Sequence, residues 1–344
     1  MRIVRGDASD RATTQACFEA VRAAGEADDP LGPPWSLRRM RGWLEHPSDP
    51  AEVWICPDDA DGSVAGWYYL ILPVRENRDR AYLYLTVRPS SRRHGIGTAL
   101  LRHAAARVAA DGRSVLGSGA FQDSAGAAFA ARMGATAGLV EARRVQMLSK
   151  IPAGRIAALR DSAARAAAGY SLVRWDGRTP DEYLARYAEV ENAMADAPHD
   201  DGEEPSVWDA DRVREQIDDV RERAGRRIYT LAALHDATGA MAAVTAVEPD
   251  PDNPEWGHQL LTAVTRPHRG HRLGLLVKAA MLQWLAEAEP RLERIVTGNA
   301  AANDHMISIN EELGYELLRP LEQSQEVVVA DVLATPVTSA GANG

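Results

Sequence analysis

Two short basic segments have residue types that can hold a phosphate group. One runs from Arg92 to Gly97 and the other from Arg269 to Gly274. Arginine and histidine side chains supply charge and hydrogen-bond donors, and glycine lets the backbone come close to an anion. The residues are Arg92, Arg93, His94, Gly95, Ile96 and Gly97 in the first turn, and Arg269, Gly270, His271, Arg272, Leu273 and Gly274 in the second turn. Two such segments in matching contexts indicate two sites for the same kind of ligand.

Each turn lies between a segment typical of a strand and a segment typical of a helix. Residues 81–87 precede the first turn and 98–110 follow it, while 258–265 and 275–287 flank the second turn. Backbone N–H groups at the start of a helix point outward, and the helix dipole favours a negative charge there. The sequence therefore predicts two phosphate-binding turns, each at the N-terminus of a helix.

The two halves of the chain repeat the same order of predicted elements. Gly97 and Gly274 are separated by nearly the same number of residues as Gly134 and Gly314, which end two later helices. Such constancy is typical of a duplicated unit, and 344 residues suffice for two domains. We expect domains at residues 1–150 and 170–333, a linker helix over 151–169 and a disordered tail over 334–344.

The composition argues against several classes of function. The chain is 45% hydrophobic and 26% charged, as folded domains are, and its net charge of −10 argues against a nucleic-acid partner. No apolar run approaches the roughly 18 residues of a membrane span, and there is no signal-peptide pattern. Cys17 and Cys56 lie outside any metal-type spacing. We therefore expect a cytoplasmic protein with no metal site and no membrane partner. Its Arg-rich, Lys-poor composition is typical of bacteria.

With these turns and elements in place, the chain resembles the GNAT superfamily of N-acetyltransferases, in a tandem two-domain bacterial form with a mycothiol-synthase-like layout. The resemblance covers residues 1–150 and 170–333. It implies an α/β (mixed α+β) fold class, with two tandem GNAT-type domains that are each a twisted mixed sheet flanked by helices. In this family the turn binds the pyrophosphate of acetyl-CoA or a related acyl-CoA. The preceding strand, here near Val87 and Val264, splays from its neighbour and pairs with the pantetheine arm. A later helix motif implies that Asn303 contacts the cofactor.

The chain also departs from the family pattern. Arg272 stands where the second turn has its first family glycine, and the later motif of the first half has lost its Asn. Many family members place a general-acid Tyr four positions before the glycine that ends the later helix. Those positions are Asn310 and Ala130 here, so neither half keeps that acid.

Three residues of the second half are candidates for catalysis. His258 begins the strand before the second turn, where some relatives carry a base, and histidine titrates in the range that deprotonation of an amine requires. By counting from the turn, its equivalent in the first half is Ala81. The alternative is a surface histidine on a hairpin. A backbone N–H near Thr262 is the candidate donor to the developing oxyanion.

Asp196 is the third candidate, because it ends the helix that lines the acceptor side in this fold. The acidic run 200–204 follows it and would form a negative rim that attracts a cationic amine, or else a solvated loop. In the first half, several aromatic residues could line an acceptor pocket, although aromatics at strand spacing more often belong to a core. They are Trp35, Trp67, Tyr69, Tyr82 and Tyr84.

Together these features predict an N-acetyltransferase that moves an acetyl group from acetyl-CoA to a primary amine of a small molecule by direct attack. No cysteine or serine lies in a nucleophile context, and the second domain is the expected catalytic one. The alternative is a non-catalytic acyl-CoA-binding or regulatory protein, which the missing Tyr favours. The acceptor stays open among amino acids, aminoglycoside-like antibiotics, polyamines and biosynthetic intermediates, and the protein is expected to be a monomer or homodimer.

Overall fold

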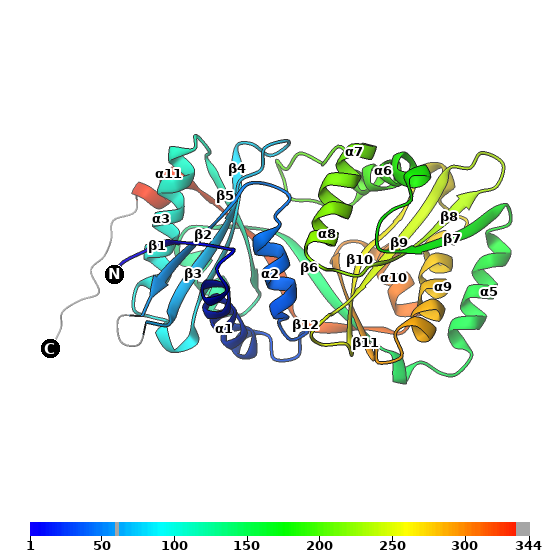
Figure 1. Cartoon of the computed structure of the whole chain (residues 1–344), viewed down its shortest axis with the longest axis horizontal. Coiled ribbons are helices and arrows are strands. Elements are labelled where there is room, and N and C mark those ends of the chain that lie inside the picture. Colours follow the sequence, from blue (N-terminus) through cyan, green and yellow to red (C-terminus); the bar gives the residue numbers. More distant parts are fainter. Residues whose placement is uncertain (59–61, 335–344) are drawn as a thin grey trace. The chain divides into compact units, whose positions relative to one another are not determined.

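A computed structural model describes residues 1–58 and 62–334, which form two compact units (Figure 1). The first unit holds Met1–Glu141, Asp200–Glu204 and the chain from Arg319 onward, and the second holds Ala142–His199 and Pro205–Leu318. Residues 335–344 of the expected disordered tail lie outside the described residues.

The first unit is a mixed sheet with helices on both faces. Its strands lie in the order β1-β2-β3-β4-β5-β12. The strands are β1 (Val4–Gly6), β2 (Ala51–Pro57), β3 (Val64–Ile71), β4 (Arg80–Val87), β5 (Val115–Phe121) and β12 (Tyr315–Val328), and the helices are α1 (Arg11–Asp28), α2 (Leu37–Glu45), α3 (Ile96–Ala110), α4 (Ala125–Arg132) and α11 (Val329–Ala334).

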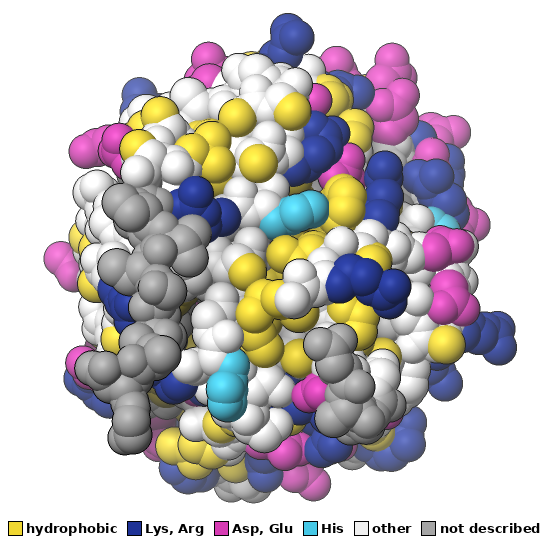
Figure 2. All heavy atoms as spheres, turned by 90° about the vertical axis from the view of Figure 1, so that its left-hand side faces the viewer, with side chains coloured by type: hydrophobic (Ala, Val, Ile, Leu, Met, Phe, Trp, Pro, Cys, Tyr) yellow, Lys and Arg dark blue, Asp and Glu magenta, His cyan; other side chains and the backbone are white. Residues whose placement is uncertain are grey.

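Side chains alternate along β3 between two cores of the first unit. Tyr68 and Leu70 pack with α3 and α11 on one face, whereas Trp67 and Tyr69 pack with α1 and α2 on the other. This period of two is what a strand covered by helices on both faces requires. The side of the unit that bears α11 also exposes hydrophobic side chains among acidic and basic ones (Figure 2).

The second unit repeats this architecture, with strands in the order β6-β11-β10-β9-β8-β7. The strands are β6 (Thr136–Met147), β7 (Tyr170–Asp176), β8 (Tyr229–His235), β9 (Met241–Pro249), β10 (Trp256–Val264) and β11 (Arg294–Ala300), and the helices are α5 (Arg155–Ala166), α6 (Leu184–Asn192), α7 (Ala210–Arg212), a π-helix (Val213–Asp219), α8 (Val220–Arg223), α9 (Leu273–Ala288) and α10 (Asp304–Glu312). α5 and α9 share one core, and α6 and the π-helix share the other.

The units do not follow the expected contiguous boundaries. β6 begins in the first unit and ends in the second, and β12 does the reverse. Residues 322–328 of β12 pair with β5, and Val329 and Val332 of α11 complete the core under α3. Without β12, the edge of β5 would present unpaired backbone groups, which is the physical reason for this exchange.

The expected linker helix is also part of a core. α5 packs beside α9 (Figure 1), and Ala163 and Ala167 are buried there. The Ala-rich composition of this segment therefore serves close helix packing within the second unit. It is not a spacer between two domains.

Both units contain a pair of parallel strands that separate. β4 pairs with β5 only from Arg80 to Tyr82, and β10 pairs with β11 only from Trp256 to His258. We call these the first and second forks, and call the last paired position the apex. A forked pair of this kind is what the resemblance implied for the strand before each turn. None of the described helices is long and apolar enough to cross a membrane.

Candidate functional site

The two turns share one backbone conformation but place their glycines differently. In the first turn Arg93 and Gly95 have positive φ values of 69° and 81°. In the second turn the corresponding Gly270 and Arg272 have φ values of 87° and 54°. Each turn therefore holds one arginine in the left-handed region, which disfavours side chains with a Cβ. The second turn therefore has arginine where the first has Gly95, and glycine where the first has Arg93.

The last glycine of each turn lies where two helices and a strand meet. A Cβ at Gly97 would lie 3.4 Å from the Phe129 ring of α4, and one at Gly274 would lie 3.2 Å from Ile309 of α10. The strand residues at these contacts are Val87 and Val264, each 3.7 Å from the added Cβ. The two predicted strand positions therefore lie beside the start of the turn helix.

An aspartate holds the first arginine of each turn. Arg92 donates through Nε to the Val87 carbonyl at 3.2 Å and forms a bidentate pair with Asp28, at the end of α1. Arg269 donates in the same way to the Val264 carbonyl at 3.2 Å, and its Nη2 lies 2.7 Å from Asp196. Sequence reasoning missed Asp28, although its place at the end of the first helix matches that of Asp196.

Asp196 is bound by two arginines, one of them in the second turn. Arg266 forms two further hydrogen bonds of 2.8 Å to its carboxylate. The hydrogen bonds from Arg266 and Arg269 lower the pKa of Asp196 below its usual value. A carboxylate that two guanidinium groups keep ionised is a poor general base. Asp196 therefore binds the arginines in and just before the second turn.

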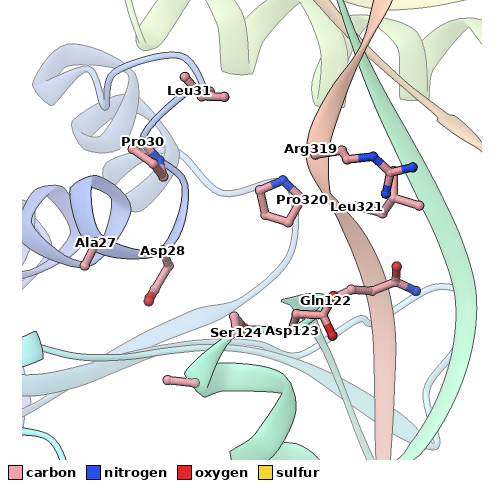
Figure 3. A pocket seen from close by; sticks show the side chains of 11 residues that line it. Ala27, Asp28, Pro30, Leu31, Gln122, Asp123, Ser124, Arg319, Pro320 and Leu321 are labelled. Atoms are coloured by element: carbon pink, nitrogen blue, oxygen red, sulfur yellow. The ribbon is translucent and has the colours of Figure 1, made fainter.

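The first unit has a cavity of about 490 Å³ at the open end of the first fork (Figure 3). It is lined by Ala27, Asp28, Pro30 and Leu31 after α1, by residues 122–125 between β5 and α4, and by residues 319–321 of β12. Figure 3 shows the Asp28 carboxylate and the Pro320 ring turned toward a common space, with Arg319 extending away from it. Since Asp28 also binds Arg92, the cavity adjoins the first turn.

His258 lies at the apex of the second fork, where β10 leaves β11. Its side chain is 11% exposed, so the interpretation as a free surface histidine is wrong. Its Nε2 lies 3.5 Å from Oδ2 of the buried Asp250. Burial raises the pKa of the Asp250 carboxyl, but hydrogen bonds from His258 and from the Asp252 and Asn253 backbone outweigh it, and the net pKa is lowered. The pair joins an imidazole to an ionised carboxylate.

A β-bulge changes the expected equivalence between the halves. The pairing of β10 with β9 shifts between Gln259 and Leu261, which leaves Leu260 as the extra residue. His258 and Tyr82 are each the third paired residue of their fork. The counterpart of His258 is therefore Tyr82, and the equivalence with Ala81 from residue counting is wrong because of the inserted residue.

Tyr82 at the apex of the first fork is bound to the acidic run. Its hydroxyl donates to Glu203 at 2.9 Å. Burial raises the pKa of Tyr82, and the Glu203 carboxylate raises it further. The apex of the first fork thus carries a neutral phenol, whereas that of the second carries an imidazole.

The acidic run Asp200–Glu204 is held in place by hydrogen bonds, while Asp201 and Glu204 stay exposed. It belongs to the first unit, where the Gly202 carbonyl accepts from Arg80 at 3.0 Å and Glu204 binds Asn77. Asp200 accepts from the Leu139 N–H at 2.7 Å. Of the aromatic candidates, Trp67 and Tyr69 are core residues, as the alternative for this group stated.

The remaining predicted residues of the second unit are held by neighbours. Thr262 is in register with Thr245, and their hydroxyls lie 2.9 Å apart. Asn303 caps α10, with its Oδ1 3.2 Å from the Met306 N–H. Asn310, at the general-acid position, is fully buried and donates to Asn299 at 2.8 Å. Within residues 1–58 and 62–334, no group of three or more His, Cys, Asp or Glu side chains could hold a metal ion.

Comparison with known proteins identifies the family. The family model described as "Acetyltransferase (GNAT) family" matches residues 15–135, which lie in the first unit. A tandem GNAT protein from the clavulanic acid biosynthesis pathway, solved without AcCoA, is 30% identical; the match covers 95% of this chain and 98% of that one, with a TM-score of 0.79. The chain therefore belongs to the GNAT acetyltransferase family and has the tandem fold of that structure.

A more distant structure shares the fold. The GCN5-related N-acetyltransferase from Sphaerobacter thermophilus is 15% identical over 95% of both chains, with a TM-score of 0.68. A comparison with curated protein sequences gives no match.

Proposed function

We propose that this protein transfers an acetyl group from acetyl-CoA to a primary amine of a small molecule, by direct attack in the second unit. Membership of the GNAT family supports acyl transfer in general. The observation that carries the assignment to the second unit is the His258–Asp250 pair at the fork apex. An imidazole held by a carboxylate is suited to take a proton from an ammonium group near neutral pH.

The two turns fit the diphosphate of coenzyme A. α3 and α9 begin with no side-chain cap, whereas Ser124 caps α4 and Asn303 caps α10. The first N–H groups of a helix need acceptors, and a phosphate oxygen can supply them. At Gly95 and Gly270 an added Cβ would meet no atom within 4 Å, so each turn is open on that side. Arg92 and Arg269 lie beside these N–H groups, where Asp28 and Asp196 already bind them, so the backbone N–H groups are the main proposed donors to the diphosphate.

The reaction needs a base, a donor to the oxyanion and a leaving thiolate. In the proposed step His258 takes a proton from the substrate ammonium, and the free amine then attacks the thioester carbon. The C–N bond forms and the C–S bond breaks. The proton that the attacking nitrogen still has to lose passes to the departing thiolate of coenzyme A, directly or through water, so the products are the amide and the free thiol. The backbone between Leu260 and Thr262, where the bulge releases β10 from β9, is the proposed donor to the oxyanion.

A second candidate function is non-catalytic binding of acyl-CoA. Four observations favour it. The general-acid position of the second unit holds the buried Asn310, and both the family match and the cavity lie in the first unit, whose apex Tyr82 is bound to Glu203. In this case the first unit would hold the nucleotide and no amine would be acylated.

Thiol release from acetyl-CoA with a panel of small amines, beside calorimetric titration with coenzyme A, tests both candidates. We expect turnover that Arg269→Ala abolishes and that the matched Arg92→Ala leaves largely intact. His258→Gln should abolish turnover without weakening coenzyme A binding, and His199→Gln, at an exposed loop position, is the control. Tight binding with no turnover on any amine would overturn the enzymatic proposal and favour the binding protein.

A further inference from the structure

The chain contains two lysines, Lys150 and Lys278, among 39 basic side chains. Lys150 is exposed and pairs with Glu316. Lys278, in α9, is 3% exposed and forms no ion pair with any residue that the structure describes. Burying a cation without a counter-charge is costly, and burial lowers the pKa of Lys278 to about 7. The proposed reaction does not use this side chain, so its retention in a core calls for another explanation.

Lys278 lies beside the apex of the second fork. Its Nζ donates to Oε1 of Gln259 at 3.0 Å and lies 4.9 Å from the centre of the Tyr315 ring. Gln259 directly follows the apex residue His258 and directly precedes the bulge residue Leu260. The buried lysine therefore contacts the residue at which β10 leaves its regular ladder.

Gln259 ties the bulge together through its amide nitrogen. Nε2 lies 2.7 Å from the Ala246 carbonyl, 2.8 Å from the Leu261 carbonyl and 3.0 Å from the Thr245 hydroxyl. The Gln259 amide presents its oxygen to the Lys278 amine and its nitrogen to these three oxygen atoms. Contact with Lys278 thus keeps the Gln259 nitrogen directed at β9 and at the far side of the bulge.

The first unit lacks both this pair and the bulge. β3 and β4 keep an unbroken register from Gly66↔Val87 to Ile71↔Tyr82. Leu83 takes the place of Gln259 after the apex, and Leu101 takes the place of Lys278, four residues after the last glycine of the turn. Both leucines are buried in one core. The polar pair is present in the fork that is bulged and absent from the fork that is not.

We propose that Lys278 is a positioning residue that holds the β10 bulge through Gln259, and so keeps the backbone at Leu260 turned out of the β9 ladder. Its catalytic consequence rests on the proposed function, because that backbone is the proposed donor to the oxyanion. Its structural consequence does not depend on turnover. The titratable side chains on the packed elements include Tyr315, under the amine, and Tyr229 of β8, whose hydroxyl binds Glu289 at the other end of α9. On β9 and β10 they include Glu248, which binds Arg226, and His258, which lies near Asp250.

Backbone hydrogen exchange in the full chain tests the structural consequence. Lys278→Met removes the donor, and we expect exchange at residues 261–264, which pair with β9 beyond the bulge, to become at least about tenfold faster, an amount equal to roughly 1.4 kcal/mol of local stability. Lys278→Arg keeps a donor and should retain most of the protection. Leu101→Met is the matched control and should leave β4 unchanged. Equal exchange in the wild type and Lys278→Met would overturn the proposal.

Two further measurements keep the test decisive. The double variant Lys278→Leu/Gln259→Leu recreates the Leu–Leu pair of the first unit, so it should fold, and we expect it to lower kcat at least about tenfold with little change in KM. Lysine labelled with ¹³C at Cε reports Lys278 against only one other lysine, and its signal should shift in Gln259→Leu. If the wild type releases no thiol, the proposed function fails, while exchange and the lysine signal still decide the role of Lys278.

Discussion

The two forks have the same backbone arrangement but different side chains at and after the apex. Each has three paired positions, a turn with two left-handed residues and an aspartate on the first arginine. At and after the apex, however, the first fork has Tyr82 and Leu83, whereas the second has His258 and Gln259. The frame of strand, turn and helix is therefore common to both units, whereas the residues at and after the apex differ.

The two turns also differ in which of their left-handed positions holds a glycine. The backbone has to enter the left-handed region at two positions, but each unit places a glycine at only one of them and an arginine at the other. The conformation is thus imposed by the strand and helix that the turn joins. A single glycine, in either position, is compatible with it.

The largest expected effect comes from removing the exchanged strand. A fragment of residues 1–150 lacks β12 and α11, and with them Val327, Val329 and Val332 of the first core. Burial of each valine contributes roughly 1.5–3 kcal/mol, so the fragment should not fold cooperatively. Circular dichroism on heating checks this. Joining residues 319–334 to the fragment through a flexible linker should restore a transition. A fragment that melts like the full chain would show that the first unit stands without the exchange.

Substituting the apex side chain of each fork should show which fork supports catalysis. We expect His258→Gln to lower kcat by about 10²–10⁴, the usual contribution of a general base, and Tyr82→Phe to leave it within about twofold. Steady-state thiol release measures both. If instead Tyr82→Phe abolished turnover and His258→Gln did not, catalysis would belong to the first unit.

Lys278 should make the free energy of unfolding depend on pH, whereas Leu101, at the same position in the first unit, should not. Because its pKa is about 7 in the folded protein and near 10.5 when unfolded, the unfolded chain binds more protons between these values. The free energy of unfolding should therefore rise with pH between about 7 and 9, by on the order of 1 kcal/mol per pH unit. Urea denaturation checks this, and Lys278→Met should flatten the rise. A slope unaffected by Lys278→Met would refute it.

The smallest effects are expected at the turns. Gly95→Ala and Gly270→Ala place a Cβ in the left-handed region and should each cost about 1 kcal/mol. Arg93→Gly and Arg272→Gly relieve strain but loosen the unfolded chain, so each should change stability by less than about 1 kcal/mol. Thermal unfolding of the four variants measures this. A large loss of stability in Arg93→Gly or Arg272→Gly would mean that the arginine side chain holds the turn.

Local patterns in the sequence predicted much of this molecule. The strand, turn and helix around Gly97 and Gly274, the duplication and the absence of Tyr at Asn310 are all read from residues close together in the chain. Secondary structure, turn conformation and helix dipoles depend on such neighbours. The same patterns led to the family and to the fork.

Tertiary structure decided everything that joins distant residues. The exchange of β6 and β12, the docking of Asp200–Glu204, the pairing of Asp28 with Arg92 and the contact of Lys278 with Gln259 involve partners far apart in the chain. Because of one inserted residue in β10, the residue of the first unit that corresponds to His258 is Tyr82 and not Ala81. Sequence alone determined which residues could bind a phosphate or take a proton; only packing decided which carboxylate each of them meets, because that choice depends on which strands and helices come together in space.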